Sequence, residues 1–149
     1  MSLEERVQKD MVQAMKSKDA DKLRALRAIK SEILLAKTDG SGHAIDEERE
    51  LKILQKMIKS RQESYDIYTR EGREDLAERE KSEIDHIQIY LPEQMSESAI
   101  ADRVDAIIAQ VNATSMKDMG KVMGMAQKEM GGKADGKTIA DLVKARLSQ

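Results

Sequence analysis

The residues with the clearest chemical pattern are GGKADGKT at 131–138, which match the G-x-x-x-x-G-K-[ST] pattern of a phosphate-binding P-loop. A P-loop needs a strand that delivers a Gly-rich loop to a helix N-terminus, so that loop amides surround the phosphates. The preceding residues, KVMGMAQKEM, have helical spacing instead. Asp135 also falls at a predicted N-cap, where its carboxylate would compete with a phosphate for the same amides. We therefore interpret the stretch as a Gly-rich turn between two helices and expect no ATP or GTP site.

The remaining polar residues do not form a recognisable catalytic or metal-binding pattern. His43 and His86 are isolated from each other, and the chain has no Cys. Acidic pairs such as Glu78 and Glu80 lie in charge-rich helical segments, which favours a salt-bridged surface over acid–base catalysis. We predict no catalytic residues, no metal and no cofactor.

A G-x-x-x-G pattern at Gly120 and Gly124 predicts close approach of two helices. Dimerisation within a membrane is not favoured, because Lys121 and Lys128 interrupt the segment. No apolar run reaches the length of a membrane span, and the first residues, MSLEERVQKD, are too charged for a secretory signal. We predict a cytoplasmic protein without a membrane partner.

Basic residues are concentrated near the C-terminus, although the whole chain has a net charge of −2. Residues 113–149 contain seven Lys or Arg and four Asp or Glu, whereas residues 92–112 contain one and four. The ordinary interpretation is a solvated helix surface, and the alternative is contact with the phosphates of a folded RNA. The candidate nucleic-acid-binding residues are Lys121, Lys128, Lys133, Lys137, Lys144 and Arg146, accompanied by Lys117.

Two further basic stripes have helical spacing, Lys52–Lys56–Lys59 and Arg24–Arg27–Lys30. The only aromatic residues are three Tyr, so binding of single-stranded nucleic acid through base stacking is not favoured.

Helical periodicity in residues 1–91 predicts an array of about four helices. Asp21 is the expected N-cap of the second helix, and a turn at 38–43 precedes a long helix from about Asp46 to Glu71 that ends at Gly72. A further helix is expected from about Asp75 to Tyr90. The inward positions of the first two helices are Leu3, Val7, Met11, Ala14, Met15, Leu23, Leu26, Ile29, Ile33 and Leu34, and those of the long helix are Leu51, Leu54, Met57 or Ile58, Tyr65 and Tyr68.

The single proline, Pro92, marks the predicted domain boundary, so we expect domains at 1–91 and 92–149. The sequence leaves open whether the two domains are rigidly docked or hinged near this residue. The second domain is predicted to be a small bundle of three helices capped by Ser96, Ser115 and Asp135. Asp118 completes a predicted capping box with Ser115. The fold class is therefore all-α. The Met residues of this part either fill its core or form an adaptable interface.

The C-terminal stretch MGKVMGMAQKEMGGKADGKTIADLVKARL (119–147) resembles the tail of the GatB subunit of the tRNA-dependent amidotransferase. SRQESYDIYTREGREDLAERE (60–80) and YLPEQMSE (90–97) extend the resemblance, and nearly the whole chain is similar to stand-alone GatB/YqeY proteins. The matching motif residues of the tail are Gly120, Val122, Met123, Gly132, Ala134 and Asp135.

The resemblance implies an all-helical, two-part fold and a link to tRNA. In the amidotransferase, the tail domain engages tRNA while other domains form the amide with glutamine as nitrogen donor. Those catalytic domains have no counterpart here, so a family label of carbon–nitrogen ligase activity would be inherited from the larger protein. The expected function is a non-catalytic tRNA-binding module whose partners are tRNA and an aminoacylation or amidation enzyme. The alternative is a helical protein–protein interaction adaptor without an RNA role.

Overall fold

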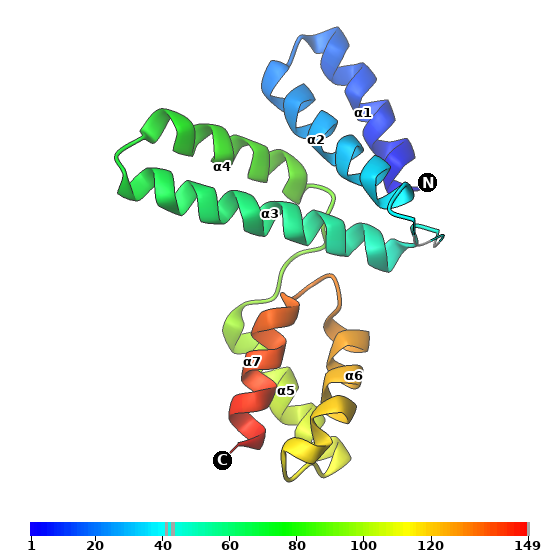
Figure 1. The fold of residues 1–149 in the computed structure, drawn as a ribbon, viewed down its shortest axis with the longest axis vertical. Helices are drawn as coiled ribbons and strands as arrows, with labels where there is room; N and C mark the ends of the chain where they lie inside the picture. The colour runs from blue at the N-terminus through cyan, green and yellow to red at the C-terminus, as the bar shows by residue number, and fades with distance from the viewer. Residues whose placement is uncertain (41, 43, 149) are drawn as a thin grey trace. The chain divides into compact units, whose positions relative to one another are not determined.

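The computed structural model describes residues 1–40, 42 and 44–148, and in this part of the chain helices are joined by turns and loops, with no β-strand (Figure 1). The predicted all-α class is confirmed. The elements are α1 (Leu3–Ser17), α2 (Ala20–Lys37), α3 (Glu47–Arg70), α4 (Glu74–Gln88), α5 (Glu97–Val111), the 3₁₀ turn η1 (Met116–Asp118), α6 (Met119–Met130) and α7 (Gly136–Leu147).

The chain divides into two compact units, unit 1 at Met1–Leu91 and unit 2 at Pro92–Gln149. Each unit has its own hydrophobic core. All buried residues of the first core lie between Leu3 and Tyr90, and all those of the second lie between Ile100 and Leu147.

Unit 1 consists of two helical hairpins, α1–α2 and α3–α4, whose helices run side by side (Figure 1). α2 packs against α4 and, less extensively, against α3. The core side chains come from all four helices because each helix places residues three and four apart on one inner face. They are Leu3, Val7, Met11, Ala14, Ala25, Leu26, Ile29, Ile33, Leu54, Met57, Ile87 and Tyr90.

Side-chain caps fix the starts of α1, α2 and α3 in unit 1. Ser2 and Glu5 form a capping box at the start of α1, and Asp46 accepts a hydrogen bond from the Arg49 amide at the start of α3. The predicted Asp21 cap of α2 is wrong: Asp19 accepts from the Lys22 amide (3.1 Å), and the helix already begins at Ala20. The sequence also predicts a turn at 38–43, of which Ser41 and His43 lie outside the described residues.

Gly72 has φ of 72°, as expected of a glycine that follows a helix C-terminus.

Helical periodicity overestimated the inner face of the first hairpin, since Met15 is 48% exposed and Leu34 is 61% exposed. Both residues lie at the margin of their helices' apolar stripes. On α3, Leu51, Tyr65 and Tyr68 are half-buried.

Two polar contacts join the helices of unit 1. The Arg61 guanidinium pairs with Glu83 between α3 and α4 (3.1 Å) while also donating to the Met57 carbonyl (3.2 Å). At the end of the unit, the buried Tyr90 hydroxyl donates to the Asp10 carboxylate. Burial, followed by the neighbouring Asp10 carboxylate, raises the pKa of Tyr90, so this phenol stays protonated and keeps α1 tied to the segment after α4.

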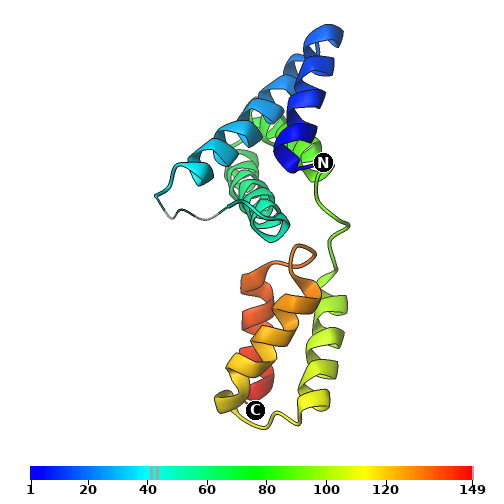
Figure 2. The same cartoon turned by 90° about the vertical axis from the view of Figure 1, so that its right-hand side faces the viewer.

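Unit 2 is a three-helix bundle in which α5, α6 and α7 each contact the other two (Figure 2). Ser96 caps α5 by accepting from the Ala99 amide (3.1 Å), as predicted. The Ser115–Asp118 capping box is also confirmed, although it opens the short turn η1 rather than α6 itself. Two amide hydrogen bonds, from Thr114 and Ser115, lower the pKa of Asp118 and keep its carboxylate ionised.

Candidate functional site

The P-loop-like stretch is a turn between two helices, as the sequence predicted. α6 precedes it, and the turn amides already have partners: Gly131 donates to the Gln127 carbonyl (2.9 Å), and both Lys133 and Ala134 donate to the Met130 carbonyl (2.9 and 3.1 Å). These three amides are engaged within the turn, and a helix stands where a P-loop has a strand. The stretch therefore lacks the architecture that a P-loop requires.

The segment after Pro92 holds this turn in place. The Met95 amide donates to the Lys133 carbonyl (2.8 Å), and the Gln94 side-chain amide donates to the Gly132 carbonyl (2.8 Å). These contacts join residues almost forty positions apart, so local sequence patterns carried no signal for them. They fix the backbone at Lys133 while its side chain remains exposed.

Most of the motif residues shared with the GatB tail have structural roles. Val122 and Ala134 are buried, and Met123 packs against the core of unit 2. Gly132 has φ of 83°, a left-handed conformation that side chains disfavour. These positions build the α6–α7 hairpin.

Asp135 occupies the N-cap position of α7, but its side chain does not form the predicted backbone cap. Its carboxylate instead accepts from the Thr138 hydroxyl (3.2 Å). The predicted start of the helix is correct, whereas the predicted side-chain contact with the helix amides is wrong.

The predicted close helix approach at Gly120 and Gly124 is also wrong. Both glycines are exposed, and a Cβ atom added at either position would meet nothing within 4 Å. The spacing of four residues places both glycines on one side of α6, but that side is open to solvent.

The candidate lysines follow one another along the α6–turn–α7 hairpin. Lys121 and Lys128 are seven residues apart on α6, as are Lys137 and Lys144 on α7, so each pair lies on one face of its helix. Lys133 lies in the turn between them. All five side chains are exposed. We call these five residues the lysine row.

Two other charged residues of the α6–α7 hairpin form ion pairs with α5 and so differ from the lysine row. Arg146, the sixth candidate, is held by Asp105 (2.8 Å), and Glu129 is held by Arg103. Within the described residues, no ion pair engages Lys128, Lys133, Lys137 or Lys144. Lys121 lies near Asp118, and the exposed Asp135 and Asp141 are acids close in sequence to Lys133, Lys137 and Lys144. The structure thus leaves a mainly basic hairpin whose cationic side chains are largely unengaged.

The two basic stripes of unit 1 are less available. Lys52 pairs with Glu48 (3.3 Å), and Arg24 pairs with Asp21 (3.4 Å). Lys30 donates to the Gln8 side chain (2.9 Å). Neighbouring acids and amides therefore engage part of each stripe, which distinguishes both stripes from the lysine row.

The described residues were also compared with two other kinds of site, a metal-binding cluster and a membrane-spanning helix, and form neither. This part of the chain contains no group of three or more His, Cys, Asp or Glu placed to hold a metal ion. None of its helices combines the length and apolarity needed to cross a membrane.

Comparison with known proteins gives a match along nearly the whole chain. The family described as "Yqey-like protein" matches residues 4–147. Similar curated proteins include "Altered inheritance of mitochondria protein 41, mitochondrial" of Pyrenophora tritici-repentis, which is 31% identical over 87% of this chain and 71% of its own length. The proteins of the same name from Eremothecium gossypii and Lachancea thermotolerans are 29% and 30% identical over 72% and 73% of this chain. The chain spans about 60% of the length of these two relatives.

Proposed function

This chain belongs to the Yqey-like protein family, and from that premise we propose that it is a non-catalytic tRNA-binding accessory module. The observation that carries the proposal is the lysine row of unit 2, with its exposed and mostly unpaired side chains. Lysines placed in this way attract phosphates without the cost of breaking an existing ion pair. The resemblance of residues 119–147 to the GatB tail supports tRNA as the ligand.

The proposed mode of binding is contact with the RNA backbone. Unit 2 has no Phe, Trp or Tyr, so it lacks the side chains on which unpaired bases stack. Lysines can neutralise the phosphates of a folded RNA at many points along its surface. We expect affinity to depend strongly on salt and weakly on base sequence.

The proposed cellular role is to act beside an aminoacylation or amidation enzyme. The resemblance to one subunit of a glutamine-dependent tRNA amidotransferase supports this role, and the catalytic step would belong to the partner. A cytoplasmic location remains a prediction from the sequence. The word "mitochondrial" in the relatives' names describes those proteins.

The alternative function is a protein–protein interaction adaptor without an RNA role. Exposed apolar side chains on unit 1, among them Leu34 and Leu35, favour this alternative. The Met residues of unit 2 favour it less. Met130 is buried and Met119, Met123 and Met125 pack against the core, while Met116 is 41% exposed.

The first test is binding of the whole protein to labelled tRNA across a salt series, with duplex DNA and an unstructured RNA as competitors. Saturable binding that prefers tRNA and weakens as salt rises would support the proposal. Absence of binding at low salt would refute it and leave the adaptor function as the working hypothesis.

The double variant Lys133→Ala/Lys137→Ala should bind tRNA several-fold more weakly. Each lost phosphate contact should also reduce the slope of log K against log salt by about one. The matched control is Lys56→Ala/Lys81→Ala, which removes two exposed lysines from unit 1. Both variants should keep the helical circular dichroism of the parent. Equal losses in the two variants would contradict a site on the lysine row.

A further inference from the structure

The outer face of the α1–α2 hairpin carries an open groove beside exposed apolar side chains. Val12, Met15 and Leu34 are 38%, 48% and 61% exposed. The groove has a volume of about 500 Å³. Its lining residues are Glu4, Glu5, Gln8, Lys9, Val12 and Lys30.

Two cross-hairpin contacts place Leu34 at the rim of this groove. Lys30 donates to Gln8 (2.9 Å), and Lys37 pairs with Glu4. Leu34 lies four residues after Lys30 and three before Lys37, so it shares their face of α2, next to α1. On α1, Val12 follows Gln8 at the same spacing. Apolar side chains from both helices thus flank the groove.

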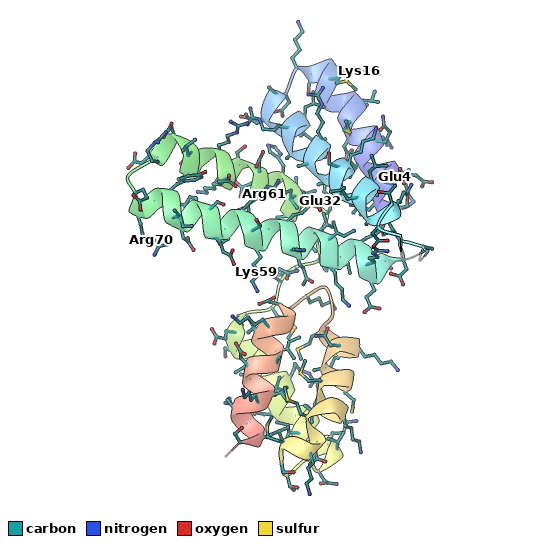
Figure 3. The ribbon with its side chains drawn as sticks, viewed as in Figure 1. Glu4, Lys16, Glu32, Lys59, Arg61 and Arg70 are labelled. Atoms are coloured by element: carbon teal, nitrogen blue, oxygen red, sulfur yellow. The ribbon has the colours of Figure 1, made fainter. Side chains whose placement is uncertain are left out.

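The charges on the outer face of α1 are arranged in two halves, whereas Arg6 and Asp10 lie on a different side of the helix, where both contact Tyr90. Glu4 and Glu5 lie in the first turn, whereas Lys9 and Lys16 lie further along the helix (Glu4 and Lys16 are labelled in Figure 3). Acids near the N-terminus and bases near the C-terminus of a helix are stabilised by its dipole. The same arrangement also affects how two copies of α1 can pair. When two copies of α1 run antiparallel, the acidic half of each copy faces the basic half of the other. A symmetric dimer requires this kind of self-complementary surface.

We propose that this chain forms a homodimer in which the α1–α2 hairpins of two copies pack face to face with α1 antiparallel to its counterpart. The four helices then form a bundle, the usual solution for two hairpins that each present an apolar strip. Val12, Met15 and Leu34 are covered by the second copy, and Glu5 faces the lysines of the opposite α1. The contacts of Lys30 with Gln8 and of Lys37 with Glu4 stay within each copy.

The first experiment measures the mass of the full chain by sedimentation equilibrium over a concentration series. We expect a reversible monomer–dimer equilibrium in the parent. Leu34→Glu should weaken self-association at least about tenfold, because each dimer would bury two unpaired carboxylates. Leu35→Glu is the matched control: it changes the adjacent and equally exposed leucine (62%), which points about 100° away around α2. Circular dichroism checks that both variants remain folded.

The second experiment uses charge reversal to test the partner's identity. With Glu5→Lys, Glu4 is the only acid that remains on the outer face of α1. With Lys9→Glu/Lys16→Glu, the same face of α1 carries only acids. Each variant alone should self-associate at least about tenfold more weakly, since like charges would face each other. An equimolar mixture of the two should recover the dimer, because the two reversed faces are complementary.

Three outcomes would overturn the proposal. The parent could remain monomeric at its highest soluble concentration, which would leave this face to a different protein. A dimer that is insensitive to Leu34→Glu would use another surface. A mixture of the charge-reversed variants that stays monomeric, with both variants folded, would contradict the antiparallel pairing of α1. None of these measurements depends on RNA binding, so the dimer and the proposed function can fail separately.

Discussion

Gly124 lies in the middle of α6 although nothing in its surroundings requires a glycine. A Cβ at this position would meet no atom within 4 Å, and the residue has an ordinary helical conformation. Glycine inside a helix costs stability because it loses more backbone freedom on folding than alanine does. Gly131 differs: a Cβ there would lie 2.5 Å from the Gln127 carbonyl oxygen. The two glycines therefore predict opposite responses to the same substitution.

We expect Gly124→Ala to raise the free energy of unfolding by about 0.5–1 kcal/mol. Gly131→Ala should lower it, since the backbone of the turn must shift to relieve the contact. Urea unfolding followed by circular dichroism measures both changes. A destabilised Gly124→Ala variant would mean that the exposed side of α6 is covered in solution.

The ends of the helices can be tested with single substitutions, because single polar side chains fix several of them. Ser96 accepts from the Ala99 amide and satisfies one of the free amides at the start of α5. We expect Ser96→Ala to destabilise unit 2 by about 1 kcal/mol. Ser98→Ala is the matched control, since Ser98 lies two residues after Ser96, within the first turn of the same helix, and is exposed. Similar losses in the two variants, measured by thermal unfolding, would contradict a specific role for the cap.

The elements themselves could be predicted well from the sequence, because each helix has an apolar stripe and recognisable ends. Asp46, Gly72, Ser96 and Ser115 marked real boundaries. The errors arose where local signals compete. Asp21 was the predicted cap of α2, whereas Asp19, two residues earlier, is the cap in the structure.

Residues at the edge of a helix stripe show the limit of periodicity. Leu34 has core-like spacing on α2, but it remains exposed because no helix of unit 1 covers that edge. The pattern at Gly120 and Gly124 failed for a similar reason, since spacing shows which residues share a face and not what packs against it. Periodicity therefore predicts the centre of an apolar face better than its margins.

The sequence shows which basic residues make up the candidate site, but it does not show which of them form contacts with other helices. The lysines of residues 113–149 stand out in the sequence, and the structure leaves five of the six candidates exposed. The contact of Arg146 with Asp105 spans 41 positions. Contacts of this kind depend on the docking of α5 against α7, so they follow from tertiary structure alone.

At the scale of the whole molecule, the two cores share no residue. Unit 1 buries its apolar side chains among α1–α4, and unit 2 buries a separate set among α5–α7. A core that lies within one unit stabilises that unit directly. The predicted consequence is that the units unfold as two cooperative transitions.

Matched cavities in the two cores test this expectation in the full-length protein. Leu26 in α2 is 1% exposed, and Ile139 in α7 is fully buried. Truncation of either to Ala should cost its own core about 2–5 kcal/mol. In calorimetry, Leu26→Ala should lower the midpoint of one transition and Ile139→Ala that of the other, each leaving the second transition in place. If either variant shifts both transitions together, the units are energetically coupled, and a flexible hinge at Pro92 is ruled out.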